Sequence, residues 1–349
     1  DNDFYVLTFS LNYRKGRIKS SFGGGWNTYD GRHFGEVIWA RYASNSEIRD
    51  HWYDGTGLKK DYNIYEKINF RVLDNLSLYG DIQFRYIDYE IDGLDEKLRD
   101  IALHRYFTFF NPKAGFYWDL TASQKLFASF SIGNREPNRS NFTDADPGNE
   151  PVHETLYDYE LGYEFAVRNF SVKTNVYYMD YTNQLVMTGE INNVGSPVMT
   201  NVPESYRRGI ELHLGGKPAE FVSLEANATF SQNKIKKMTS YIDDWDTWSQ
   251  VEKTLENTNL SFSPEIIANA IADIEITEKL NLTLNGKYVG EQYIDNTQNE
   301  NRKLDAYLVT NGKINYQLRL KAFEEFNIHF MVNNIFNTQY ESNAWVYTF

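Results

Sequence analysis

The stretch Phe323–Tyr340, FEEFNIHFMVNNIFNTQY, determines how the rest of the chain is interpreted. Even positions from Phe326 to Val332 are apolar, whereas the odd positions from Asn327 to Asn333 carry Asn, His, Met and Asn. This period of two puts apolar side chains on one face of an extended strand, while a helix would spread them around its axis. The stretch therefore predicts a β-strand with one apolar face.

The composition of the whole chain favours a membrane barrel. The chain has 349 residues, a net charge of -13 and no cysteine, and its mean hydropathy is -0.58 although aromatic residues reach 16%. Lipid-facing and lumen-facing residues alternate in such barrels, so hydropathy stays low while Tyr and Trp collect at the interfaces. We find no run of about 18 apolar residues and no signal peptide. The acidic balance argues against a nucleic-acid partner.

The same alternation recurs in pairs of strands joined by short turns. One hairpin runs from Ile64 to Val72, turns at Asp74-Asn75 and returns from Leu76 to Tyr86. Such strands have about ten or more residues, as a tilted strand needs to cross a bilayer, whereas strands of globular proteins have about five or six. Long polar segments separate the hairpins. These features predict an all-β, transmembrane antiparallel β-barrel with alternately short and long connections.

Segments without alternation are predicted as turns or loops. Tyr29–Gly31 has the composition of a turn, and a third strand is expected at Val37–Arg41. The predicted long loops are residues 44–60, the stretch between Tyr178 and Gly209, and residues 234–259. The parity of the first strands stays open. Gly23–Gly25 lacks the rest of a phosphate-binding motif, and glycine inside a strand pattern predicts a kink or close packing.

Further stretches resemble, in their order, the barrel of TonB-dependent outer-membrane receptors of the Bacteroidetes kind. The ending VNNIFNTQY resembles the C-terminal signature NN-(Leu/Ile)-F-(N/D)-x-x-Y of that family. The other stretches are GGGWNTYDGRHFGEVIW (Gly23–Trp39), FFNPKAGFYWDLT (Phe109–Thr121), LFASFSIGNREPNRSNF (Leu126–Phe142), ETLYDYELGYEF (Glu154–Phe165), NVYYMDYTNQLV (Asn175–Val186) and YRRGIEL (Tyr206–Leu212). From Gly23 to Tyr340, these stretches span most of the chain.

The resemblance implies a partial barrel. In that family a barrel of 22 strands encloses an N-terminal plug, and TonB pulls on a short box ahead of the plug. We expect the plug, the box and the final strand of the barrel to be absent from residues 1–349. The chain is accordingly predicted to be one partial barrel domain, with no separate second domain and with about 15 of the 22 strands.

The resemblance also implies transport. It predicts a multi-pass protein of the outer membrane of Gram-negative bacteria that binds and imports a scarce nutrient, foremost a ferric siderophore or another metal chelate. TonB would energise import through the missing plug, and outer-membrane lipid and LPS would surround the barrel. An oligosaccharide importer of the same family and a passive porin-like channel stay open, because fold alone does not decide the substrate.

Motifs for catalysis or metal binding are not found. The six histidines lack paired metal-ligand spacing, and no Ser nucleophile elbow is present. Two acidic groups, Asp144/Asp146/Glu150 and Asp243/Asp244/Asp246, lack the EF-hand spacing. We therefore expect no enzyme activity, no cofactor and no metal site. Charged residues at alternate strand positions are predicted to line the barrel; they are Asp81, Arg85, Asp158, Glu160 and Glu164.

Ligand contacts are predicted in the extracellular loops. Tyr241, Trp245 and Trp248 adjoin the second acidic group, and exposed aromatic residues mark binding surfaces. An interfacial aromatic girdle is an equal alternative for these three. Arg135 and Arg139, in the long loop that begins at Asn134, are the other predicted ligand-binding residues.

Overall fold

The structure is a computed structural model that describes residues 2–42, 47–145, 150–191, 195–244, 249–320 and 323–346. Its contacts divide the chain into two compact units. Unit 1 comprises Asp1–Gly115 and Ser131–Leu156, and unit 2 comprises Phe116–Phe130 and Tyr157–Phe349.

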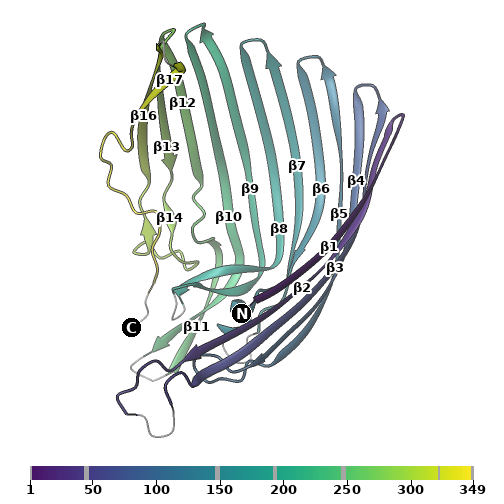
Figure 1. Cartoon of the computed structure of the whole chain (residues 1–349), viewed down its shortest axis with the longest axis vertical. Coiled ribbons are helices and arrows are strands. Elements are labelled where there is room, and N and C mark those ends of the chain that lie inside the picture. The colour runs from purple at the N-terminus through teal and green to yellow at the C-terminus, as the bar shows by residue number, and fades with distance from the viewer. Residues whose placement is uncertain are drawn as a thin grey trace. The chain divides into compact units, whose positions relative to one another are not determined.

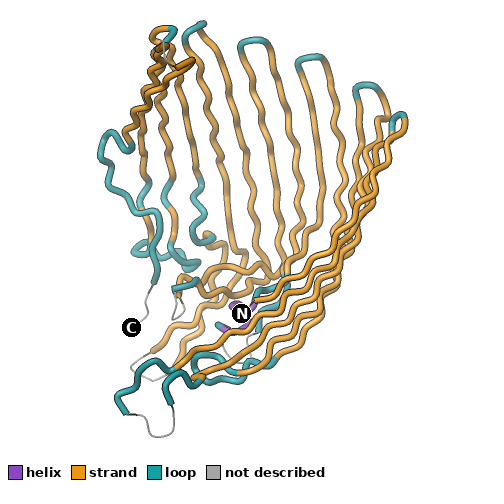
Figure 2. The backbone as a smooth tube through the Cα atoms, in the orientation of Figure 1, coloured by secondary structure: helices purple, strands orange, loops and turns teal. Residues whose placement is uncertain are grey.

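Nearly all of the secondary structure is β-strand (Figures 1 and 2). Unit 1 holds β1 (Asn2–Lys15), β2 (Ile18–Glu36), β3 (His51–Leu73), β4 (Leu76–Gly93) and the five-residue helix α1 (Arg139–Thr143). Three strands contribute residues to both units: β5 (Leu103–Thr121), β6 (Gln124–Arg135) and β7 (Glu154–Val167). Unit 2 holds β8 (Phe170–Ile191), β9 (Pro197–Ala219), β10 (Val222–Asp244), β11 (Ser249–Asn259), β12 (Ile266–Thr277), β13 (Leu280–Val289), β14 (Gln292–Tyr293), β15 (Lys303–Leu304), β16 (Tyr307–Leu320) and β17 (Phe323–Val332).

The strands follow one another in the sheet as they do in the chain. The sheet has 15 strands, of which β11 pairs only with β10, while β14 and β15 form a separate two-stranded sheet. Short turns alternate with long connections, as at Asp74-Asn75 between β3 and β4 (Figure 1). The predicted all-β antiparallel meander is confirmed, and so is its size of about 15 strands. Among the described residues, no helix has the length and apolar character to cross a membrane.

One face of each unit is apolar and exposed, and it carries a row of aromatic rings. In unit 1, Tyr62 and Tyr86 are register partners, and the ring of Tyr86 stacks on that of Tyr106 at 6.3 Å. In unit 2, the rings of Tyr159 and Tyr206 lie 6.3 and 6.2 Å from that of Tyr178. Such rows are typical of the level at which a membrane barrel meets the lipid headgroups.

Several predicted turns and loops are wrong because the strands extend beyond the aromatic row, and one predicted strand, Val37–Arg41, is also wrong. Tyr29–Gly31 lies inside β2, Val37–Arg41 is outside any strand, and the second half of the loop predicted at residues 44–60 belongs to β3. Residues predicted as loops between Tyr178 and Gly209 and at 234–259 mostly extend β8, β9 and β10 or form β11. Backbone pairing continues through these extensions without the regular alternation of apolar and polar residues that marks the exposed apolar face.

Close packing explains Gly24 in β2. A Cβ atom on Gly24 would lie 2.6 Å from the carbonyl oxygen of Asn63 and 3.0 Å from the ring of Phe9. This confirms the predicted close packing at the triple glycine, where the neighbouring strands leave no room for a side chain.

A small core lies on the opposite face of unit 1, at the strand ends that carry the long loops. It consists of alternate residues of β4 and β5 and the ring of Phe142 from α1. Its buried members are Ile87, Tyr89, Ile91, Phe107, Phe109 and Phe142. The connection between β6 and β7 therefore packs against this wall of strands. In unit 2, a second core joins Val186, Val202, Ile235 and Leu260.

Candidate functional site

The chain leaves β6 through the sequence Asn134-Arg135-Glu136-Pro137 and packs onto the polar face of unit 1. Pro137 is fully buried; its missing N–H ends the strand ladder, and it favours extended backbone at Glu136. Helix α1 begins directly afterwards. Asn138 caps it, because its side chain accepts a hydrogen bond from the backbone N–H of Asn141 at 2.9 Å.

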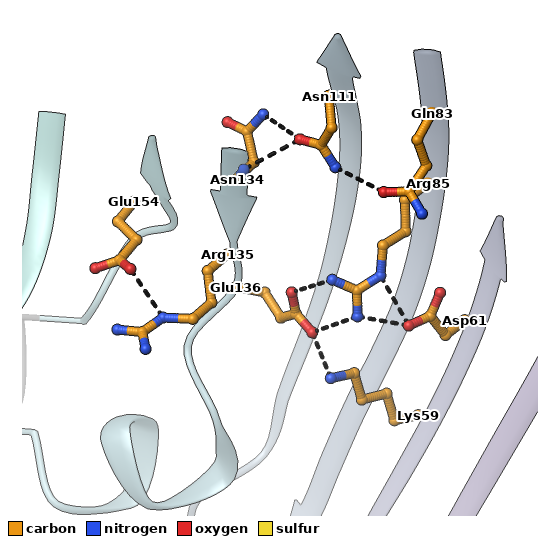
Figure 3. Close-up of polar contacts among 9 residues, drawn as sticks. All are labelled: Lys59, Asp61, Gln83, Arg85, Asn111, Asn134, Arg135, Glu136 and Glu154. Atoms are coloured by element: carbon orange, nitrogen blue, oxygen red, sulfur yellow. Dashed lines mark hydrogen bonds and ion pairs between the residues drawn. The ribbon is translucent and has the colours of Figure 1, made fainter. Parts of the chain in front are cut away.

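Four charged side chains meet where this loop contacts the strands; we name them the Arg85 cluster: Lys59, Asp61, Arg85 and Glu136 (Figure 3). The Arg85 guanidinium donates from Nε to Asp61 Oδ2 at 2.9 Å and from Nη1 to Glu136 Oε2 at 2.9 Å. Lys59 Nζ donates to Glu136 Oε1 at 2.6 Å. Glu136 thus links the loop to β3 and β4, although β5 lies between β4 and β6 in the sheet.

The Arg85 cluster is neutral and largely buried. The two carboxylates, Asp61 and Glu136, expose 8% and 7% of their side chains, against 24% for Arg85 and 27% for Lys59. Burial alone would raise the pKa of Glu136. The hydrogen bond from Lys59 and the charges of Lys59 and Arg85 outweigh burial and hold this pKa below its ordinary value. Glu136 is therefore ionised at neutral pH.

Amide side chains continue the polar contacts toward β6 (Figure 3). Asn111 in β5 donates to Gln83 Oε1 at 3.1 Å and accepts a hydrogen bond from Asn134 Nδ2 at 2.9 Å. Asn134 in turn accepts a hydrogen bond from Thr155 Oγ1 at 2.7 Å. These bonds connect the start of the loop to its return strand, β7.

The two arginines predicted to bind ligand have different surroundings. Arg135 points away from the Arg85 cluster, and its Nε donates to Glu154 Oε1 at 2.9 Å (Figure 3). Arg139 lies over two glycines of β3: a Cβ atom on Gly55 would be 3.3 Å from Arg139 Nη2, and one on Gly57 would be 3.7 Å from Arg139 Cδ. The two arginines therefore do not form one site.

The other predicted residues have separate outcomes. The side chain of Tyr241 and the whole of Trp245 and Trp248 lie outside the described residues. Among the residues predicted to line the barrel, Arg85 is in the cluster, and Glu160 accepts a hydrogen bond from Ser129 at 3.0 Å. Asp81 forms an ion pair with Lys67, and Glu164 forms one with Lys173. Asp158 also has an interaction partner.

Sequence reasoning missed Lys59, Asp61 and Glu136 as members of one cluster. The motif Asn134–Pro137 was the available signal, because it puts a carboxylate and a proline at the end of a strand. The cluster neutralises its own charges, so it suits holding the loop rather than catalysis. Among the described residues, no group of three or more His, Cys, Asp or Glu side chains is placed to hold a metal ion.

Solved structures of two receptors and one transporter are similar to this chain. The ferric-catecholate import receptor Fiu from E. coli K12 (closed form) aligns with a TM-score of 0.71 and 15% identity over 98% of this chain and 51% of Fiu. The siderophore receptor PiuA from Acinetobacter baumannii aligns with a TM-score of 0.74 and 12% identity over 99% of this chain and 53% of PiuA. The copper transporter OprC has a TM-score of 0.74 and 12% identity over 97% of this chain and 51% of OprC.

At these identities the likeness shows the fold, and the chain spans about half the length of these structures. The family itself follows from a sequence model, described as TonB dependent receptor-like, beta-barrel, which matches residues 1–335. Because this match covers nearly all of the sequence, the chain belongs to the family of TonB-dependent receptor-like β-barrels.

Proposed function

We propose that this chain is the barrel part of an outer-membrane receptor that binds a scarce metal chelate, foremost a ferric siderophore, and imports it with energy from TonB. The family match over residues 1–335 carries the proposal. Proteins of this family are transport receptors of the outer membrane. The similar structures include one siderophore receptor, one ferric-catecholate receptor and one copper transporter, which favours a metal chelate.

The division into faces supports a membrane barrel. Lipid and LPS would contact the exposed apolar face with its row of Tyr62, Tyr86 and Tyr106, and the polar face would line the lumen. We propose that both units belong to one barrel domain, and that plug and TonB-binding segments belong to the whole protein. The assignment to the Bacteroidetes-type subgroup stays a prediction.

The Arg85 cluster has a definite part in this proposal. Import requires a ligand to pass from the loops into the barrel. A loop that packs on the lumen wall therefore borders the space in which the ligand first binds. The ion pairs of Glu136 and the packing of Phe142 hold the connection from β6 to β7 on that wall. We propose that this connection forms one side of the ligand-binding vestibule.

Growth of a strain that lacks the full-length gene tests the function. We expect slower growth than the parent when iron is supplied only as a ferric siderophore, and restoration by the intact gene. Growth on limiting copper and growth on an oligosaccharide as the only carbon source are measured in parallel. A defect confined to the oligosaccharide would support the alternative importer. Equal growth of both strains on all iron chelates would contradict the proposal.

A further inference from the structure

We infer that a groove on the exposed apolar face of unit 2, with Arg208 at one end, binds an anionic, phosphate-bearing membrane lipid. The inference rests on the proposed function, because it requires this face to contact a bilayer. It concerns the apolar face of the sheet, whereas the Arg85 cluster lies on the polar face of unit 1.

The groove lies over β8, β9, β10 and the start of β12, and its volume is about 720 Å³. Its apolar floor consists of four exposed side chains, Val176, Ile210, Phe230 and Ile266. Val176 is the register partner of Ile210, and Phe230 is the register partner of both Ile210 and Ile266. Register partners project their side chains from the same face of a sheet, so the four form one continuous apolar strip. A lipid acyl chain can lie in the groove over this strip.

Arg208 lies at the end of the groove that is level with the aromatic row. It is the register partner of Tyr178, a member of that row, and of Gln232. Its Nε and Nη2 atoms donate to Gln232 Oε1 at 3.0 and 2.6 Å, and its guanidinium carbon lies 5.4 Å from the centre of the Tyr206 ring. Nη1 has no hydrogen-bond partner among the described residues, and Glu265, which also borders the groove, is beyond ion-pair distance. The guanidinium is thus held in place with donor groups left for a ligand.

The nearby carboxylates on this face pair with another cation. Lys236 Nζ lies 3.0 Å from Glu204 Oε2 and 3.6 Å from Asp180 Oδ1. Arg208 and Lys234, which projects from the same face of β10, are within ion-pair distance of no carboxylate in the part of the chain that the structure describes. Positive charge at this end of the groove is therefore available to an anionic group.

An anionic lipid fits both parts of the groove. Guanidinium forms strong charge-assisted hydrogen bonds with phosphate oxygens, and its planar shape suits their geometry. The aromatic row marks the level of the lipid headgroups, so a phosphate bound at Arg208 places the acyl chain of the same molecule against the apolar strip. A soluble anion leaves the strip uncovered, and a zwitterionic lipid brings its own cation to Arg208. The groove therefore favours an anionic lipid over both.

The test uses the full-length receptor, purified in detergent, and native mass spectrometry to measure bound lipid. The probes are dimyristoyl phosphatidylglycerol, which is anionic, and dimyristoyl phosphatidylcholine, which has the same acyl chains and is zwitterionic. The variants are Arg208→Gln, Arg208→Lys and Ile210→Trp, the last of which fills the groove without a change of charge. Arg168→Gln is the matched control, because it removes the same charge at the short turn between β7 and β8, away from the groove. Heat-modifiable migration on gels checks that each variant folds.

We expect Arg208→Gln to weaken binding of phosphatidylglycerol by about 10-fold, as for a lost charge-assisted hydrogen bond at an exposed site, and to leave phosphatidylcholine unaffected. Arg208→Lys should retain part of the affinity, and Arg168→Gln should bind like the wild type. Ile210→Trp should weaken binding of both lipids. Unchanged binding of phosphatidylglycerol by Arg208→Gln, or an equal loss for both lipids, overturns the inference. Inorganic phosphate that displaces the lipid at equal concentration overturns it too, because the site would then be one for a free anion.

The lipid site and the proposed function fail in different ways. A wild-type receptor that folds into phosphatidylcholine vesicles but does not prefer phosphatidylglycerol overturns the lipid site alone. A wild-type receptor that does not insert into vesicles overturns the proposed membrane barrel, and the lipid site with it.

Discussion

Glu136, in the loop that follows β6, accepts hydrogen bonds at 2.9 Å from two nitrogen atoms of Arg85 in β4. The two residues are not on neighbouring strands, since β5 lies between β4 and β6 in the sheet. This contact shows that the loop crosses the polar face instead of leaving it. Several measurable properties of the loop depend on it.

Glu136→Gln should loosen the loop. The substitution removes the carboxylate that pairs with Lys59 and leaves Arg85 with Asp61. Breaking a buried ion pair costs about 3–5 kcal/mol, less here because both cations are partly exposed. We expect amide hydrogen exchange of residues 136–145 to accelerate by about 10- to 100-fold, corresponding to roughly 1.4–2.7 kcal/mol. Glu150→Gln is the control, because Glu150 pairs with Arg105 in an exposed position. Equal acceleration in the control would argue against the role of Glu136.

Acid should loosen the same loop. The pKa of Glu136 in the folded protein lies below its ordinary value, so its ionisation stabilises the packed loop above the unfolded pKa. This stabilisation is lost as the pH falls through the folded pKa. Hydrogen exchange of the loop, corrected for the intrinsic pH dependence, should be constant from about pH 8 to pH 5 and accelerate below about pH 4. In Glu136→Gln this acid-dependent acceleration should be greatly reduced; an undiminished one would assign it to other groups.

Phe142→Ala should release α1 from the strands. The ring of Phe142 lies in the core of unit 1, 6.1 Å from the ring of Tyr89, and truncating a buried Phe costs about 3–5 kcal/mol. We expect trypsin to cleave after Arg139 far faster than in the wild type. Phe336→Ala serves as the control, since Phe336 is 74% exposed. Unchanged cleavage of the Phe142 variant would show that the ring does not hold the helix.

Gly24→Ala should impair assembly of the barrel. Its Cβ atom would collide with the carbonyl oxygen of Asn63 at 2.6 Å, and neighbouring backbone must move at a cost of about 1–3 kcal/mol. Gly80→Ala in β4 is the matched control, because nothing lies within 4 Å of its added Cβ atom. Urea titration of the full-length receptor in detergent measures the difference. Equal midpoints for both variants would contradict the close approach.

Charge on the apolar face should be harmful only within the proposed membrane band. Ile82→Arg introduces a charge between the aromatic row and the short turn at Asp74-Asn75. Burial of this charge in lipid would cost about 2–4 kcal/mol. Glu90→Arg changes the same face of β4 beyond that row, where the cost is about 0–1 kcal/mol. We expect much less folded Ile82→Arg receptor in lipid vesicles, judged by heat-modifiable migration on gels. Equal yields would place the membrane elsewhere.

Alternation predicted the strands only where lipid requires an apolar face. Ile64, Phe84 and their neighbours in the band follow the period of two, so their strands were found. The extensions, such as His51–Lys60 of β3, carry no such pattern, although their backbone pairing with β2 and β4 continues. Gly55, Gly57 and Lys59 there contact the loop that follows β6 instead of presenting an apolar side chain.

For the Arg85 cluster, the motif Asn134–Pro137 marks a carboxylate at the end of a strand but does not identify its partners. The pairing of Glu136 with Arg85 and Lys59 depends on the path of the loop across β5, which local sequence does not encode.

Uptake of radioactive iron tests the central claim most directly. Cells that express the full-length receptor receive the ferric chelate that supports their growth, in strains with and without functional TonB. We predict accumulation of the label only when both the receptor and TonB are present. Equal accumulation without TonB would identify a passive channel and contradict the account.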